Sequence, residues 1–212
     1  MAEKPVPRRV QPQLRFIVFA ATIGIVIGVA AALVHRSRGS AAQPSPLRAQ
    51  ITWAAGAKPA PGLALRDQRG ATISLHSLHG RVVLLTFLDS KCVRECPIEG
   101  HVLRDVLRGM RQTGADAVVV SVDPWADTPA SARTFATRAG WSGNWHWLLG
   151  DKAALAPVWR SYNIAVKRTP GDILHSTALY LIDATGDLRA GYLFPFSAAA
   201  VTQDVRRLAD GT

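Results

Sequence analysis

Two cysteines four positions apart are the side chains in this sequence best suited to chemistry. Cys92 and Cys96 are the only cysteines among its 212 residues. Two thiols at this spacing can close a disulfide, attack another disulfide as a redox-active pair, or bind a soft metal ion. They can also be buried structural thiols or form an inert disulfide, so the surrounding sequence has to discriminate between these uses.

The segments on either side of the cysteines predict a reactive environment. The apolar run 82–88 precedes them and is typical of a buried strand. Pro97 directly follows Cys96 and favours the first position of a helix, where its missing N–H costs nothing. A helix N-terminus carries partial positive charge and therefore favours the thiolate form of a nearby cysteine. We expect a strand, a loop with two thiols, and a helix over about 97–111.

His175 is the candidate third ligand for a metal held by the two thiols. Thiolate and imidazole together suit copper, and three such donors make a trigonal site. His175 stands before a predicted strand, 177–183, which in a thioredoxin-like fold lies beside the cysteine loop. A lone histidine before a strand is, by itself, more often structural, so its place in the fold carries this prediction.

Other histidines lack such a position. His76 and His79 are expected in a loop, and no ligand spacing ties them to another residue. His101 lies off the apolar stripe of the helix over 97–111, so we expect it to be exposed. His146 is expected on a short strand, on the face opposite to its two tryptophan neighbours.

The order of the predicted elements indicates an α/β protein with a thioredoxin-like fold, in which helices flank a central mixed sheet. Wholly apolar runs at 82–88 and 117–122, each followed by a helix, are typical of strands covered on both faces. A hairpin around Gly70 precedes them. The remaining predicted elements are a helix from 129 to about 138, a strand over 145–148, a helix over 152–162, a polar loop over 167–172, strands over 177–183 and 188–193, and a helix over 198–209.

The formal net charge of +10 is unevenly distributed along the chain. Residues 1–50 contain seven Lys or Arg and one Glu, which gives +6, and the other eighteen basic and fourteen acidic residues give +4. Most of the excess therefore flanks an apolar segment near the N-terminus. Basic residues interleaved with aromatic residues are not apparent, so we expect no nucleic-acid partner.

That apolar segment predicts a membrane anchor. Residues 16–34 form a run of nineteen whose only polar member is Thr22. As a helix the run would span roughly 28 Å, about the hydrocarbon thickness of a bilayer. The larger number of basic residues before it places the N-terminus in the cytoplasm. A cleaved signal peptide is the alternative, although its apolar region would be shorter and would end near a cleavage site.

The chain is therefore expected to have four parts. Residues 1–14 form a cytoplasmic tail, 15–36 a transmembrane anchor, 37–50 a linker rich in Ser, Ala and Pro, and 51–212 a thioredoxin-like domain. This organisation predicts a single-pass protein of the cell (inner) membrane with an extracytoplasmic, periplasmic domain. The thiols would then face an oxidising compartment, in which a disulfide can persist.

Five stretches within about residues 60–185 resemble the Sco/SenC family of membrane-anchored, thioredoxin-like copper proteins. The most specific are the C-x-x-x-C-P element of Cys92, Cys96 and Pro97, and the His-Ser pair at 175–176 before an apolar strand. The other stretches are the hairpin over 70–75 with Gly80 and the following strand, Ser121 to Asp123 with Pro124 and the later Asp127-Thr128-Pro129, and the run 147–150.

The resemblance implies copper binding by Cys92, Cys96 and His175. It also implies a role in assembling the binuclear copper A centre of cytochrome c oxidase, with subunit II of the oxidase or another copper protein as partner. That role can be metal delivery, reduction of the target's cysteines, or both. An extracytoplasmic thiol-disulfide reductase that needs no copper is the alternative function.

Two positions depart from the family pattern. Family members usually have Glu-Arg where this sequence has Trp125-Ala126, which changes the charge of one loop expected to face a partner. Many carry Asp immediately before the histidine, where this chain has Leu174. The second departure removes a carboxylate that would orient the imidazole, and neither departure touches the three candidate ligands.

Overall fold

The computed structural model describes residues 46–211. The predicted tail, the predicted anchor over 15–36 and most of the predicted linker lie outside the described residues. Within 46–211 no helix is both long and apolar enough to cross a membrane. The last five residues of the predicted linker contact the domain, since the backbone N–H of Arg48 donates to Asp204 at 2.6 Å.

An eight-stranded mixed sheet forms the centre of the domain, in the order β1-β10-β9-β4-β5-β6-β2-β3. β4, β5 and β6 are parallel to one another, and β9 pairs antiparallel with β4. All residues of β4 and β5 are buried, as the two apolar runs predict. The strands are β1 (Ile51–Thr52), β2 (Ala64–Asp67), β3 (Thr72–Ser74), β4 (Val83–Leu88), β5 (Asp116–Ser121), β6 (Trp145–Leu149), β9 (Ala178–Ile182) and β10 (Leu188–Leu193).

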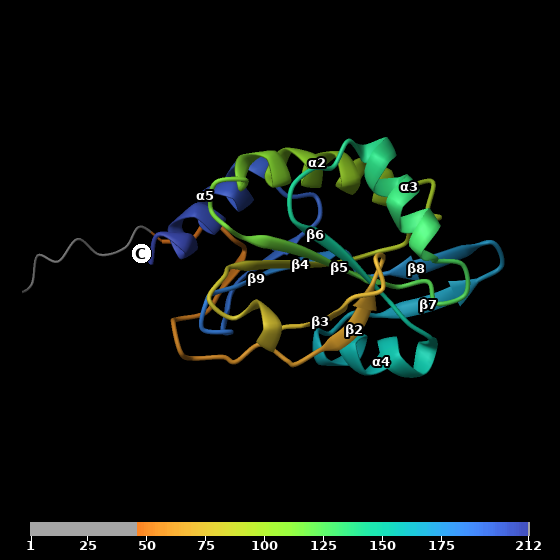
Figure 1. Cartoon of the computed structure of the whole chain (residues 1–212), viewed down its shortest axis with the longest axis horizontal. Coiled ribbons are helices and arrows are strands. Elements are labelled where there is room, and N and C mark those ends of the chain that lie inside the picture. The colour runs from red at the N-terminus through yellow and green to blue at the C-terminus, as the bar shows by residue number, and fades with distance from the viewer. Residues whose placement is uncertain (1–45, 212) are drawn as a thin grey trace, which may run out of the picture. The chain divides into compact units, whose positions relative to one another are not determined.

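Helices cover both faces of this sheet (Figure 1), which agrees with the predicted thioredoxin-like architecture. Three of them, α2 (Glu95–Gly109), α3 (Pro129–Ala139) and α5 (Ala198–Ala209), pack on one face. The other face carries α4 (Lys152–Ser161) and the short helix η1 (His76–Leu78). The alternating inward side chains of the strands thus build two cores, one on each side of the sheet.

Three helices begin at the capping residues that their sequences suggest. Thr128 forms a capping box with Ser131 at the start of α3, and Pro129 is its first helical residue. Asp151 caps α4 and Ser197 caps α5 by accepting a backbone N–H of the first turn. These local signals therefore mark where the three helices begin.

The prediction of a polar loop over 167–172 is wrong. The structure has an antiparallel hairpin there, formed by β7 (Val166–Thr169) and β8 (Asp172–His175). Pro170 and Gly171 make its turn, and Gly171 has a φ of 83°, which favours glycine. His175 therefore ends β8 rather than opening the next strand. Only Ile173 is buried among the eight residues of the two strands, so the hairpin lacks the apolar pattern from which strands are predicted.

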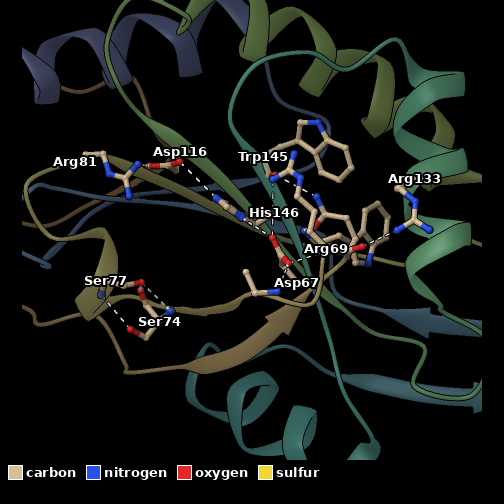
Figure 2. A network of polar contacts seen from close by, with 12 residues as sticks. Asp67, Arg69, Ser74, Ser77, Arg81, Asp116, Arg133, Trp145 and His146 are labelled. Carbon is tan, nitrogen blue, oxygen red and sulfur yellow. Dashed lines mark hydrogen bonds and ion pairs between the residues drawn. The ribbon is translucent and has the colours of Figure 1, made fainter.

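His146 has a structural role at the other end of the parallel strands (Figure 2). Its Nδ1 lies 3.0 Å from a carboxylate oxygen of Asp67, and its Nε2 lies 3.6 Å from one of Asp116. Arg81 pairs with Asp116 on the far side at 2.7 Å. The pKa of His146 is raised by Asp116 and Asp67, although burial opposes the shift. The imidazolium thus bridges β2 and β5, two elements on either side of β6.

Replacement of Gly100 by Ala is expected to destabilise the contact between α2 and α3. A Cβ at this position would lie 2.8 Å from Cζ of Phe135. That ring cannot easily move, because it makes edge contacts with Trp141 and Trp147. We expect Gly100→Ala to lower the free energy of unfolding by about 1–2 kcal/mol in urea titrations, despite the better helix propensity of Ala.

Gly62→Ala is the matched control, since no atom lies within 4 Å of a Cβ added there. We expect its free energy of unfolding to match that of the parent protein. A Gly100→Ala protein as stable as Gly62→Ala would show that the α2–α3 contact is looser than described.

Candidate metal centre

The two cysteines lie where β4 gives way to α2. β4 ends at Leu88 and α2 begins at Glu95, so residues 89–94 form the cysteine loop. Cys96 falls in the first turn of α2, which starts two residues earlier than Pro97 predicts, and is 1% exposed. Cys92 lies in the loop and is partly exposed. Both are free thiols, and the interaction between their side chains makes their acidities depend on one another.

His175 meets the buried thiol. Its Nε2 lies 3.6 Å from Sγ of Cys96, across 79 residues of sequence. Its Nδ1 lies 3.0 Å from the backbone carbonyl oxygen of Ser176. Because a carbonyl oxygen only accepts, Nδ1 carries the imidazole hydrogen and Nε2 presents its lone pair to the sulfur. The backbone carbonyl of Ser176 thus orients the imidazole, which is the role expected of a carboxylate at the position of Leu174.

Burial keeps this imidazole neutral. It lowers the pKa of His175, although the carbonyl of Ser176 and the charge of Asp89 oppose the shift. A neutral imidazole with a free Nε2 lone pair is the form that binds metals. The surroundings of His175 therefore prepare it as a ligand at neutral pH, with no proton to displace from the coordinating atom.

The two thiols differ in acidity. The hydrogen bond with Cys96 lowers the pKa of Cys92 to about 6, and backbone N–H groups of Arg94 and Cys96 assist against burial. The same hydrogen bond and burial raise the pKa of Cys96. At neutral pH the pair therefore holds one proton on Cys96, and Cys92 is the accessible thiolate.

A polar cluster fixes the cysteine loop to the end of β5. Asp127 accepts hydrogen bonds from the backbone N–H of Ser90 at 3.0 Å, from its hydroxyl, and from the hydroxyl of Ser121 at 2.6 Å. Burial raises the pKa of Asp127 to about 6 against these hydrogen bonds. Within the loop itself, Asp89 accepts the backbone N–H of Lys91 at 2.6 Å. The loop therefore has a defined path even though Cys92 is partly exposed.

Glu99 is a buried carboxyl one turn after Cys96. Thr86 Oγ1 lies 3.0 Å from Oε1 of Glu99 and 3.1 Å from the carbonyl oxygen of Ala178. Thr86 has one hydrogen for these two contacts, so both are satisfied when Glu99 is protonated and donates. Burial raises the pKa of Glu99 to about 8, although the Thr86 hydroxyl opposes the shift when it donates to the ionised carboxylate. Its other oxygen, Oε2, has no hydrogen-bond partner in the described part of the chain.

Sequence reasoning missed Glu99 and Asp127 as parts of this site. Ile98, the first apolar residue after Pro97, is 57% exposed, and the buried face of α2 instead runs through Cys96, Glu99 and Leu103. The available signal was the i, i+3 spacing of Glu99 from Cys96. Asp127 was visible only as part of a family-like stretch, because its hydroxyl partners are distant in sequence.

The three predicted ligands are not yet gathered as a closed site. Within residues 46–211, no group of three or more His, Cys, Asp or Glu side chains is arranged to hold a metal ion. Cys96 interacts with both His175 and Cys92. A three-donor site requires the three side chains to come closer together, whereas the pair of Cys96 and His175 is already in contact.

The whole domain matches a known family. The SCO1/SenC family matches residues 58–210. Over 134 residues the chain is 28% identical to the SCO1 protein homolog of Bacillus subtilis (strain 168), which covers 60% of this chain and 69% of that protein.

Solved structures give the same relationship. ScoI of Bradyrhizobium japonicum, solved with copper bound, has a TM-score of 0.63 and 28% identity, covering 72% of this chain and 99% of that one. BsSco, described as a member of the Sco family of cytochrome c oxidase assembly proteins with a disulfide switch, has a TM-score of 0.64 and 21% identity. It covers 78% of this chain and 98% of that one, and at this identity the match concerns the fold alone.

Cys92 should be the thiol that alkylating reagents modify first. In the reduced protein we expect its alkylation rate to rise with pH through a midpoint near its pKa of about 6. Cys96, which is buried with a raised pKa, should stay unmodified over that range. Mass spectrometry of peptides from pH-resolved iodoacetamide reactions measures both rates.

Cys96→Ala supplies the control for this experiment. It removes the hydrogen bond that stabilises the Cys92 thiolate, so the midpoint for Cys92 should move toward the ordinary thiol value of about 8.5. An unchanged midpoint in Cys96→Ala would mean that the loop backbone, and not the thiol pair, acidifies Cys92.

Glu99→Gln should remove a loss of stability at alkaline pH. A folded-state pKa of about 8, raised from 4.5, means that between pH 4.5 and about pH 8 the folded protein binds one more proton than the unfolded chain. The stabilisation by Glu99 is therefore complete below its unfolded pKa and is lost as pH rises through about 8. In a Cys92→Ala background, which removes one titrating thiol and its small contribution to the pKa of Glu99, the loss should be roughly 4–5 kcal/mol.

Urea unfolding at several pH values measures this loss, and Glu99→Gln in the same background should lack it. The exposed residue Glu95 provides the control, since Glu95→Gln leaves the buried carboxyl in place. Parallel pH profiles for Glu99→Gln and its parent would rule out a buried, protonated Glu99.

Proposed function

The chain belongs to the SCO1/SenC family, and on that premise we propose that it binds copper and assists assembly of the copper A centre of cytochrome c oxidase. Cys92, Cys96 and His175 are the proposed ligands, and the copper is cargo. The observation that carries the proposal is the 3.6 Å contact between Cys96 Sγ and His175 Nε2. It brings a soft sulfur donor and an imidazole nitrogen together from distant segments of the chain.

The protonation states of the three donors support copper capture in steps. Cys92 is a thiolate near neutral pH and is partly exposed, so it meets the incoming ion first. His175 is neutral and offers Nε2 without losing a proton. Cys96 has to release its proton as it binds, so affinity falls as pH is lowered. Two thiolates and one imidazole then give the soft, three-donor set that suits Cu(I).

The recipient in this proposal is subunit II of cytochrome c oxidase or another copper protein. The site lies in an extracytoplasmic domain that residues 15–36 tether to the cell membrane as a single helix. The apolar run and its basic flanks support that tether. A tethered donor meets a membrane-embedded oxidase at high effective concentration, because both are confined to one surface.

A thiol-disulfide reductase is the second candidate, and the acidity of Cys92 favours it. The Cys92 thiolate would attack a disulfide of the target, forming a mixed disulfide and releasing one target thiolate. Cys96, once deprotonated, would then attack Cys92 and release the second target thiolate. The target gains two electrons and Cys92 and Cys96 become a disulfide, so an extracytoplasmic reductant of thiol type has to restore them.

Copper titration of the reduced full chain in mild detergent tests the proposed function. We expect one Cu(I) per chain in competition with a chromophoric chelator. His175→Ala should lower the affinity by roughly 100-fold or more, because even residues that only orient a ligand change affinity 10- to 100-fold. Cys92→Ser and Cys96→Ser should each abolish tight binding.

His76→Ala is the control, since His76 is an exposed residue of η1 and is not a proposed ligand. It should bind copper like the parent protein. Equal affinities for His175→Ala and His76→Ala would contradict the ligand assignment. A reduced parent protein that binds no copper but reduces a disulfide in a peptide from an oxidase subunit would favour the reductase.

A further inference from the structure

Exposed apolar side chains gather beside the cysteine loop. The described residues expose six large hydrophobic side chains, and two of them, Val93 and Trp125, belong to this region. Val93 is 88% exposed and Trp125 42% exposed, and both line a hollow of about 650 Å³ next to Cys92. Ile173 of β8 adds a buried apolar side chain to the wall of the same hollow. Apolar patches around a concavity mark binding surfaces on soluble domains.

The acidic side chains that line this hollow are mostly buried, whereas its basic side chains are exposed. Asp89 and Asp123 are 3% and 6% exposed and form part of its wall. Both carboxylates accept hydrogen bonds from backbone N–H groups, Asp89 from that of Lys91 and Asp123 from that of Trp125. The exposed charges on the lining are those of Lys91 and Arg168, and the partly exposed Asp172 lies 3.9 Å from the exposed guanidinium of Arg94. A partner therefore meets mainly cationic and apolar groups, with Asp172 as the one partly exposed carboxylate of the lining.

Trp125 and Arg168 hold the two sides of the hollow together. The guanidinium carbon of Arg168 lies 4.9 Å from the centre of the Trp125 ring, within range of a cation–π interaction. Trp125 follows β5, whereas Arg168 belongs to β7 of the hairpin that carries His175. The contact thus orders an aromatic anchor before any partner arrives. Tryptophan and arginine are also the residue types that dominate binding energy at interfaces.

We infer that the docking face formed by Lys91, Val93, Trp125 and Arg168 binds an acidic polypeptide segment that places one apolar side chain in the hollow. The inference rests on the proposed function, in which that segment borders the copper site of the recipient protein. Cationic side chains around a concave apolar centre favour such a segment by charge complementarity. The position beside Cys92 brings the recipient's donor atoms to the most accessible proposed ligand.

An anionic membrane surface also attracts cationic and apolar groups. The hollow favours a polypeptide, because a concave wall accepts a single projecting side chain and offers little to a flat layer of headgroups. Membrane binding at this face is therefore an outcome that the test has to separate from peptide binding.

The test compares two labelled peptides without cysteine, one rich in Asp and Glu around a central leucine, the other with Lys at the acidic positions. Binding of each to the full chain in detergent is measured by fluorescence anisotropy. We expect the acidic peptide to bind at least about tenfold more tightly at low salt and to weaken as salt is added. Vesicles with and without an anionic lipid provide the third probe.

Two variants locate the surface. Trp125→Ala should weaken binding of the acidic peptide about tenfold, with partial recovery in Trp125→Phe, and Arg168→Gln should weaken it and reduce its salt dependence. Leu193→Ala and Arg160→Gln are the matched controls, because both residues are exposed on elements that do not line the hollow. Both controls should bind within about twofold of the parent protein.

The outcomes distinguish this inference from the proposed function. Trp125→Ala should still bind one copper, since Trp125 is not a proposed ligand. A chain that binds the acidic peptide but no copper overturns the proposed function and leaves the docking face in place. The docking face is overturned if both peptides bind with equal affinity, or if Trp125→Ala leaves the affinity for the acidic peptide unchanged. Binding of anionic vesicles but not of peptides, with dependence on Trp125, assigns the face to the membrane and also overturns it.

Discussion

The contact between the buried Cys96 thiol and the imidazole of His175 is the interaction on which the rest of the site depends. Both groups are withdrawn from water, and desolvation disfavours the charged form of each. The result is a protonated sulfur facing an unprotonated nitrogen, with the hydrogen of Nδ1 fixed by the carbonyl of Ser176. An arrangement of this kind holds two donors in contact without the cost of a buried charge.

The fold holds each half of that contact by different means. Cys96 is part of the main core, because the first turn of α2 is fixed by packing of the helix on the sheet and on α3. His175 ends an exposed hairpin, whose orientation depends on fewer apolar contacts. Asp127 joins the cysteine loop to the end of β5, and Arg168 joins the hairpin to Trp125. The site is thus built on the buried core, and Cys92 and the docking face lie at its exposed rim.

The sequence predicted those parts of the structure that are encoded locally. β4 and β5 follow from their apolar runs, and the starts of α3, α4 and α5 follow from their capping residues. The β7–β8 hairpin was missed because its two four-residue strands are rich in polar residues and lack the apolar pattern from which strands are predicted. The pairing of His146 with Asp67 and Asp116 has no local signal, since the strands that carry these residues are brought together only by the sheet. The burial of Glu99 likewise depends on which face of α2 meets the sheet.

The central claim, that Cys92, Cys96 and His175 share one copper ion, is tested most directly by X-ray absorption spectroscopy of the protein loaded with one Cu(I). The account predicts a shell of two sulfur scatterers and one nitrogen scatterer, and it predicts that the nitrogen disappears in His175→Ala while both sulfurs remain. A shell of sulfur alone in the parent protein, or a nitrogen contribution that persists in His175→Ala, would contradict it.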